Sequence, residues 1–208
     1  MLAAITAGVS KSGKPLFPLM PYHNYHQMHV NDATAIVAYL RTLEPIVNTV
    51  PPSRVPPPLR LAMRMMPHRA TLRTDTVALS GVAYGRYLTL LAGCADCHTK
   101  RTMGNLAKKA PFAGGMAVRI NGGTLRSANI TPDLETGIGR WTRQDFINRF
   151  RAYDSATHHT PAVADGFNTV MPWTLYAGMT DADLGSIYDY LKIVRPVKHR
   201  VTVFTTRR

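Results

Sequence analysis

The stretch Gly81-Val-Ala-Tyr-Gly-Arg-Tyr-Leu-Thr-Leu-Leu-Ala-Gly-Cys-Ala-Asp-Cys-His98 decides how the second half of the chain folds. Its first part is apolar and rich in helix formers, and it leads directly into a Cys-x-x-Cys-His motif. In such a motif each thiol adds across a vinyl group of haem, and the imidazole that follows faces the iron. The stretch therefore predicts one covalent haem c, attached through Cys94 and Cys97, with His98 as an iron ligand.

Two other uses of the cysteine pair are less well supported. The chain has 2 cysteines, both in the motif, so none remains for a disulfide or for a second pair of zinc ligands. A thioredoxin-like redox pair requires a βαβ context, which the surrounding sequence does not provide. The haem interpretation is therefore the one we carry forward.

The second half of the chain otherwise reads as helices joined by long loops. A glycine-rich, loop-like region spans residues 100–139, and a helix is expected at 142–153 with Thr142 as its N-cap. The last helix opens at Thr180, again an N-cap, with Asp183 in its first turn. No strand alternation is convincing, so we expect an all-α class with long loops.

Composition shifts divide the chain into four parts. Residues 1–50 end in a helix with an apolar face at 33–43, and residues 51–80 are a linker rich in proline and arginine. We interpret the methionine-rich end of that linker as a strap between domains rather than as a membrane-docking element. Residues 81–200 form the haem domain, and residues 201–208 form a basic tail.

The chain contains an internal repeat. The segment Met20–Pro45 overlays residues 171–196 without gaps, and nine of the 26 aligned positions are identical. Each copy has a Met-Pro loop that leads into a helix, but only the second copy is preceded by a Cys-x-x-Cys-His motif. We therefore interpret the first 50 residues as the C-terminal half of a second haem domain, in which Met20 has no haem to bind.

A methionine is the expected second iron ligand, because it raises the reduction potential and favours electron transfer. Met171 and Met179 both lie just before the last helix, whereas Met103 and Met116 lie further away. Met179 directly precedes a helix N-cap, where an apolar residue usually packs back on the helix. Met171 sits in the loop next to Pro172, which restricts the backbone. We favour Met171 and keep the other three as alternatives.

The net charge limits the possible partners. The chain carries 25 Lys and Arg residues against 12 Asp and Glu residues, a formal charge of +13. This charge favours an acidic protein partner or an anionic membrane surface. Nucleic acid is not expected, because the sequence has no helix-turn-helix, zinc-finger or aromatic-basic pattern. No apolar run approaches the roughly 18 residues that span a bilayer.

Several motifs together resemble a known family, the multi-haem cytochrome c subunits of bacterial membrane-bound dehydrogenases for gluconate, alcohol or aldehyde. The most specific of them is an Asn-Ile-Thr-Pro-Asp stretch followed by Gly-Ile-Gly-x-Trp. The motifs that carry the resemblance are Gly85-Arg-Tyr-Leu88, Cys94-Ala-Asp-Cys-His-Thr99, Phe112-Ala-Gly-Gly115, Ser127-Ala-Asn-Ile-Thr-Pro-Asp-Leu-Glu-Thr-Gly-Ile-Gly-Arg-Trp141 and Met171-Pro-Trp173.

The resemblance implies an all-α, cytochrome c-like domain with long loops, preceded by the C-terminal half of a second such domain. It also implies that Met171 binds the iron opposite His98. Asn129, Ile130, Thr131 and Trp141 would then line the haem edge, where hydrogen-bond donors can meet the propionates. The alternative for this loop is ordinary turn chemistry.

By the same resemblance, the chain is an electron carrier rather than an enzyme. It would take electrons from a dehydrogenase subunit and pass them to a downstream acceptor of the respiratory chain. A haem enzyme or ligand sensor with an open sixth position is the first alternative. A non-functional fragment that never binds haem is the second.

The start of the chain departs from the family pattern. It lacks the basic segment and the long apolar stretch of a signal peptide, although haem c is attached outside the cytoplasm. We expect the periplasmic side of the inner membrane from the haem chemistry. We also expect an N-terminally truncated form of the family, with a second polypeptide that supplies the missing half as the alternative.

Overall fold

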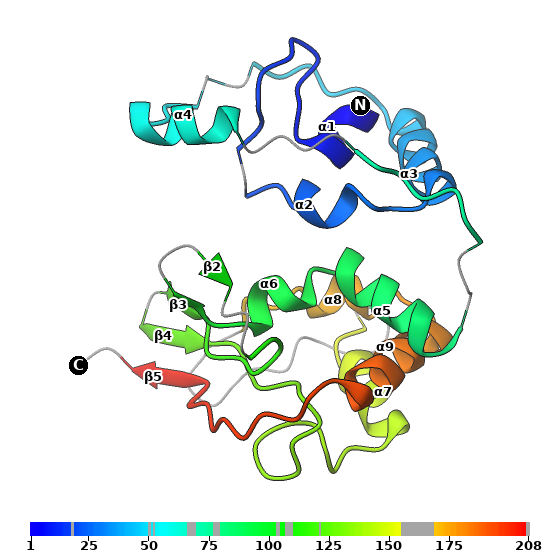
Figure 1. Cartoon of the computed structure of the whole chain (residues 1–208), viewed down its shortest axis with the longest axis vertical. Helices are drawn as coiled ribbons and strands as arrows, with labels where there is room; N and C mark the ends of the chain where they lie inside the picture. The colour runs from blue at the N-terminus through cyan, green and yellow to red at the C-terminus, as the bar shows by residue number, and fades with distance from the viewer. Residues whose placement is uncertain are drawn as a thin grey trace. The chain divides into compact units, whose positions relative to one another are not determined.

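The chain folds into two compact units, Met1–Val77 and Ala78–Arg208 (Figure 1). The structure is a computed structural model, and it describes residues 1–17, 19–49, 51, 53–65, 70–76, 80–102, 105–106, 110–120, 122–154 and 169–206. The division between the units falls inside the segment that the sequence marks as a linker. Met103, one of the alternative iron ligands, lies outside the described residues.

The described residues of the first unit form four helices and a segment that returns to them. Its described helices are α1 (Leu2–Ala7), α2 (Tyr22–Tyr25), α3 (Val30–Thr42) and α4 (Pro57–Arg64). Helix α1 packs against α2 and α3. After α4 the chain returns, so that the N–H of Arg73 donates to the carbonyl of Met28 at 3.0 Å. The Met28 side chain is buried in this unit.

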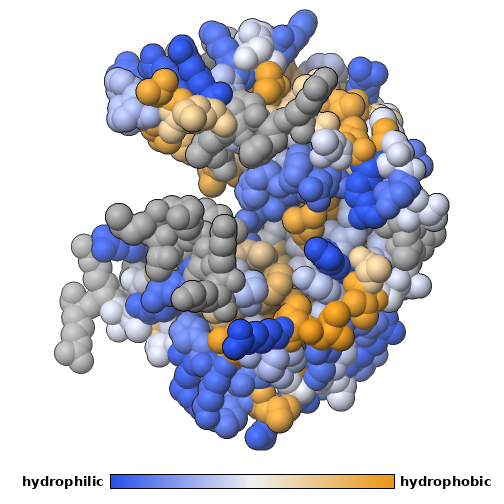
Figure 2. All heavy atoms as spheres, viewed as in Figure 1, coloured by the Kyte–Doolittle hydropathy of each residue, from blue (hydrophilic) through white to orange (hydrophobic). Residues whose placement is uncertain are grey.

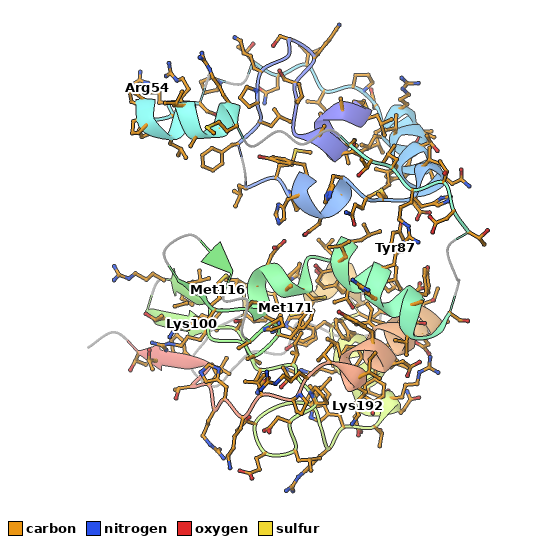
Figure 3. The ribbon with its side chains drawn as sticks, in the orientation of Figure 1. Arg54, Tyr87, Lys100, Met116, Met171 and Lys192 are labelled. Atoms are coloured by element: carbon orange, nitrogen blue, oxygen red, sulfur yellow. The ribbon has the colours of Figure 1, made fainter. Side chains whose placement is uncertain are left out.

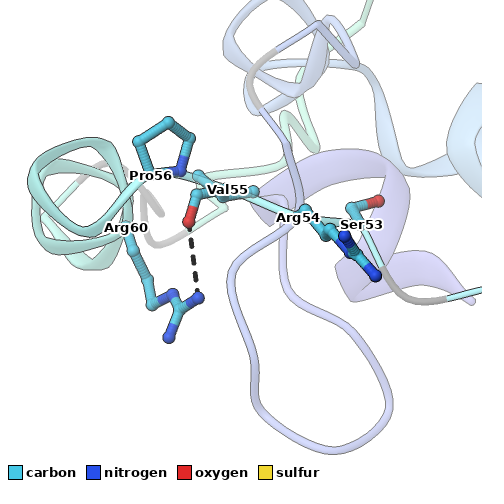
Figure 4. Close-up of a pocket in the computed structure, with 5 residues that line it drawn as sticks. All are labelled: Ser53, Arg54, Val55, Pro56 and Arg60. Atoms are coloured by element: carbon cyan, nitrogen blue, oxygen red, sulfur yellow. Dashed lines mark hydrogen bonds between the residues drawn. The ribbon is translucent and has the colours of Figure 1, made fainter.

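Helix α4 lies within the proline-rich linker. Its first residues are prolines, whose fixed φ suits the first turn of a helix, and its Met63 is buried. A surface pocket precedes it, lined by Ser53, Arg54, Val55, Pro56 and Arg60 (Figure 4). In this pocket the Arg60 guanidinium donates to the carbonyl of Val55 at 3.3 Å, so Arg60 ties the start of the helix to the preceding segment.

The second unit packs its helices around one apolar core. The helices are α5 (Gly81–Leu91), α6 (Cys94–His98), α7 (Arg143–Arg151), α8 (Trp173–Tyr176) and α9 (Asp181–Ile193). Helix α5 crosses α9 in the most extensive helix contact of the described residues. The core comprises Phe112, Ile138, Phe146, Ile147, Phe150, Leu184, Ile187 and Leu191. It therefore joins α7, α9 and the long loop between α6 and α7.

Two helix starts in this unit are confirmed as the sequence predicts them. The Thr142 hydroxyl accepts from the backbone N–H of Asp145, and the Asp145 carboxylate accepts from the N–H of Thr142. Thr180 and Asp183 form the same reciprocal capping box at the start of α9. These pairs satisfy backbone donors that the first turn of a helix leaves without a partner.

The expectation of an all-α class is wrong. Strands β3 (Ala117–Ile120), β4 (Gly123–Arg126) and β5 (Phe204–Thr206) form an antiparallel sheet in the order β3-β4-β5, and β1 (Arg101–Thr102) pairs with β2 (Asn105–Leu106). Strands of two to four residues are too short to show an alternating pattern. The sequence Asn121-Gly122 between β3 and β4 is a signal for a hairpin turn, and Gly122 has the positive φ, 89°, that such a turn uses.

The internal repeat is confirmed in the helix boundaries. Helices α2 and α3 have the same lengths as α8 and α9, and all four boundaries are displaced by 151 residues. The turn before each pair is also the same. The N–H of Tyr22 donates to the carbonyl of Met20 at 2.9 Å, and the N–H of Trp173 donates to the carbonyl of Met171 at 2.8 Å. None of the helices in the described ranges is both long and apolar enough to cross a bilayer.

Candidate functional site

The imidazole of His98 is buried and held in one orientation. Its Nδ1 lies 2.8 Å from the carbonyl oxygen of Ala128. A carbonyl can only accept, so Nδ1 carries the proton and Nε2 keeps its lone pair for a metal. Burial lowers the pKa of His98 below its usual value, and the hydrogen bond to Ala128 opposes that shift in part. The neutral form, which binds metals, is therefore favoured.

The loop that holds His98 depends on two unusual backbone positions. Phe112 has a φ of 63°, and its N–H donates to the Thr99 hydroxyl at 3.2 Å. Gly114 has a φ of 74°, and a Cβ placed there would lie 2.5 Å from the carbonyl carbon and oxygen of Ala128. Its N–H donates to the carbonyl of His98 at 2.7 Å. The backbone of Gly114 thus contacts both partners of the imidazole hydrogen bond.

The two thiols lie on the same short helix, α6, one and four residues before His98. The Cys94 side chain packs against the apolar core, whereas Cys97 is exposed, and neither forms a disulfide. Burial raises the pKa of Cys94 to about 12. A reactive or zinc-binding cysteine has a lowered pKa instead. Burial therefore keeps Cys94 in its neutral thiol form.

Met171 lies in the loop before α8 and packs, half-buried, against the same core as Cys94 (Figure 3). A hydrogen bond connects α8, which follows Met171, to the segment before the cysteine helix: the Tyr176 hydroxyl donates to the carbonyl of Ala92 at 2.7 Å. Ala92 is the C-cap of α5, two residues before Cys94. The bond therefore holds the helix after Met171 against the end of the helix that leads into the two cysteines.

The other methionines occupy different places. Met116 is hydrogen-bonded through its backbone to Ser127, the neighbour of Ala128, so it lies directly before β3, beside the segment that supports His98. Met179 packs against the core just before α9, as a hydrophobic staple does, and its carbonyl accepts from Arg151 at 2.6 Å. Met171 stays the predicted second ligand.

The polar residues of the predicted haem edge are engaged within the protein. The Asn129 amide donates to the carbonyl of Val197 at 2.8 Å and to the Thr136 hydroxyl at 3.1 Å. Its oxygen accepts from the N–H and the hydroxyl of Thr131. Both side chains therefore tie the loop to the segment after α9. Their role at a haem edge stays a prediction.

The other two residues of that edge differ in exposure. Ile130 packs against the core, and its N–H donates to the carbonyl of Phe112 at 2.9 Å. Trp141 is 37% exposed, and its carbonyl accepts from the Tyr188 hydroxyl at 2.7 Å. Like the polar pair, they remain candidates.

An aromatic cluster beside the methionine loop has no counterpart among the sequence predictions. Trp173 stacks on Tyr153, with ring centroids 4.8 Å apart and an angle of 9° between the rings. The Arg149 guanidinium lies 5.1 Å from the centroid of Trp173. The indole Nε1 is buried, and no described residue accepts its proton. These residues fix the side chain two positions after Met171.

The residues present fit a haem c. Two thiols stand three positions apart on one helix, an imidazole next to them directs Nε2 away from its hydrogen-bond partner, and a thioether packs against the same core. This is the donor set that covalent haem requires: two sulfurs for the vinyl groups, and nitrogen and sulfur for the iron.

Comparison with known proteins gives relatives over about half of the chain. One of the nicotinate dehydrogenase subunits of Pseudomonas putida is 39% identical over 120 residues, which cover 55% of this chain and 9% of that protein. The gluconate 2-dehydrogenase cytochrome c subunit of Pantoea cypripedii is 33% identical over 58% of this chain and 25% of its own length. The fructose dehydrogenase cytochrome subunit of Gluconobacter japonicus is 34% identical over 56% and 22%.

The resemblance to cytochrome c subunits of dehydrogenases is therefore confirmed for the matched segment. The matched residues span about a quarter or less of these three relatives. No protein-family model matches the chain.

Proposed function

We propose that the chain is a c-type cytochrome unit that binds one haem c through Cys94 and Cys97 and transfers one electron at a time. The observation that carries the proposal is the buried His98, whose Nδ1 proton is held by the Ala128 carbonyl so that Nε2 is directed to a metal. The names of the relatives agree, because they include cytochrome c subunits. When bound, haem c supplies the one-electron iron couple.

The proposal assigns each site residue a role in binding the haem. Cys94 and Cys97 would hold the group covalently, and His98 and Met171 would bind its iron. A methionine ligand raises the potential and leaves no open position for oxygen or substrate. The apolar core beside Cys94 and Met171 excludes water, which keeps the site suited to electron transfer rather than to catalysis.

The partners follow from the relatives and from the charge. A dehydrogenase subunit would supply the electrons, and an acceptor of the respiratory chain would take them. The net charge of +13 favours an acidic face on such a partner, or an anionic membrane surface. Because haem c is attached outside the cytoplasm, the proposed location is the periplasmic side of the inner membrane.

The test is to express the full chain behind an export signal, together with haem-maturation machinery. We expect covalent haem on a denaturing gel, and its loss when Cys94 and Cys97 are both replaced by serine. The spectrum should be low-spin, with the weak far-red band of a methionine–iron bond. Met171→Ala should remove that band, whereas the matched change Met116→Ala should leave it.

The same spectra separate the alternatives. A high-spin form that binds carbon monoxide without any mutation indicates an open sixth position, as in a haem enzyme or a sensor, and refutes the carrier. Absence of covalent haem from the exported chain refutes haem binding altogether and favours a fragment without function.

A further inference from the structure

The two copies of the repeat differ in what covers their last helix. In the second unit, Ile187 and Leu191 of α9 are 4% and 1% exposed, because they lie in the apolar core. The same positions in α3 are Ile36 and Leu40, which are the identical residues in sequence but are 40% and 38% exposed. Helix α3 therefore has the same apolar face as α9, but in α3 this face is exposed whereas in α9 it is buried in the core.

The face that α9 presents to α5 is also repeated. A Cβ on Gly85 of α5 would lie 1.7 Å from the carbonyl oxygen of Ser186 and 3.0 Å from the Cβ of Tyr190. These two positions of α9 therefore form the crossing point with α5. Their equivalents in α3 are Ala35, which is again small, and Tyr39, which is again tyrosine and is 65% exposed.

The neighbouring helix of the first unit contacts a different side of α3. A pocket next to α1 is lined by Leu2, Thr34, Val37, Ala38 and Arg41. The exposed apolar residues of α3 form one stripe, at the spacing of a single helix face, and apolar atoms are visible over α3 in Figure 2. We call it the α3 stripe: Ala35, Ile36, Tyr39, Leu40 and Leu43. None of the residues that line the pocket belongs to this stripe.

We propose that the α3 stripe binds an apolar helix of the α5 kind, supplied from outside residues 1–208. Such a helix has a small residue where it crosses Ala35 and continues into its own Cys-x-x-Cys-His motif. The second unit shows this arrangement complete, with α5 seated on α9 and α6 directly after it. The occupant is therefore a helix of the α5 kind from a partner chain, not an arbitrary apolar surface.

Met20 extends this inference to the iron. It is half-buried and sits in the same turn as Met171, with its carbonyl accepting from the residue two positions on. A docked helix with its own haem would thus meet a methionine that is already in place. This extension rests on the proposed function, because it assumes that Met171 binds iron. The docking of the helix does not depend on it.

The test uses the full chain, with or without haem, and a labelled synthetic peptide with the sequence of residues 80–99, in which both cysteines are serine. Helix α9 is already covered by α5, so among the helices that the structure describes the α3 stripe is the exposed face equivalent to it. Fluorescence anisotropy should show saturable binding. Leu40→Asp should weaken it at least tenfold, because it places a charge in the contact.

Ala38→Asp is the matched control, because the equivalent position of α9 already carries Asp189. It adds the same charge to α3 at a position outside the α3 stripe, so the dissociation constant of the peptide should change by less than about twofold. Circular dichroism of both variants shows whether α3 stays folded. Because the peptide carries no haem, the result is independent of the spectra that test the proposed function.

Two results would overturn the inference. The first is no saturable binding up to about millimolar peptide, or equal binding by the Leu40→Asp variant, which means that the stripe is not a helix site. The second is a dimer in sedimentation velocity that Leu40→Asp converts to monomer, which means that a second copy of the chain covers the stripe.

Discussion

Replacing Gly85 by alanine should destabilise the second unit by about 2 kcal/mol, because α5 and α9 touch backbone to backbone at this position. The added Cβ would lie 1.7 Å from the Ser186 carbonyl oxygen, where ordinary contact begins at 3.4 Å. The helices must therefore separate by about 1.7 Å locally. Overpacking of this kind costs about 3 kcal/mol, and the better helix propensity of alanine returns about 1 kcal/mol.

Gly185→Ala is a matched control on the partner helix. Its Cβ would meet atoms of the Arg143 guanidinium at 2.3–2.4 Å, but that side chain is 51% exposed and can swing away. The move would break only its ion pair with Asp189, at 3.5 Å on the surface, which is worth about 0–1 kcal/mol. The gain in helix propensity is the same, about 1 kcal/mol, so the stability should stay the same or rise by up to about 1 kcal/mol.

Urea unfolding followed by tryptophan fluorescence measures this difference in the right unit, because both tryptophans, Trp141 and Trp173, lie in it. At a slope of about 2 kcal/mol per molar urea, Gly85→Ala should lower the midpoint by about 1 M. Gly185→Ala should leave the midpoint unchanged or raise it by up to about 0.5 M. Equal midpoints for the two variants would refute the close helix contact as a source of stability.

Three further changes test the surroundings of the site. Gly114→Ala places a side chain at a positive φ and against the Ala128 backbone, whereas Gly122→Ala places one at a positive φ in open space. Gly114→Ala should therefore lower the free energy of unfolding by about 2 kcal/mol more than Gly122→Ala. It should also lower the yield of covalent haem on a stained gel. Arg151→Lys should lower the free energy of unfolding in urea by about 1–2 kcal/mol, because the Arg151 guanidinium donates to two backbone carbonyls and a carboxylate after α8. Arg149→Lys should lower it by less, because Arg149 stacks over the Trp173 ring. Hydrogen bonds from Thr142 in the capping box lower the pKa of Asp145 below 3.8. The ionised carboxylate therefore stabilises the fold above pH 3.8, and this stabilisation is lost as the pH falls through the lowered pKa. Asp145→Asn should flatten that part of a plot of melting temperature against pH.

Local signals in the sequence explain which parts of the fold were predictable. The capping boxes at Thr142 and Thr180 place helix starts because both partners lie within four residues. The repeat fixes α2 and α3 because its second copy aligns without gaps. Both depend on residues that are close in sequence or strictly repeated.

The sheet and the support of His98 were not predictable for the opposite reason. Strand β5 pairs with β4 across about 80 residues, and three residues carry too little pattern to indicate a strand. The partner of His98 is a main-chain carbonyl 30 residues away, and the side chain of Ala128 gives no sign of it. The local signal for this contact is the glycine pair Gly114-Gly115, which has positive φ values. The sequence does not show why these positions need a positive φ.

The choice of a peptide carbonyl as the partner of His98 has a consequence for how the protein tolerates change. An acceptor on a side chain can be deleted by one codon substitution, whereas every residue type at position 128 provides the same oxygen. Drift at that position therefore leaves the electron donation of the imidazole intact, as long as the backbone path is kept. The structural constraint then falls on Gly114, whose missing side chain preserves that path, more than on the residue that makes the bond.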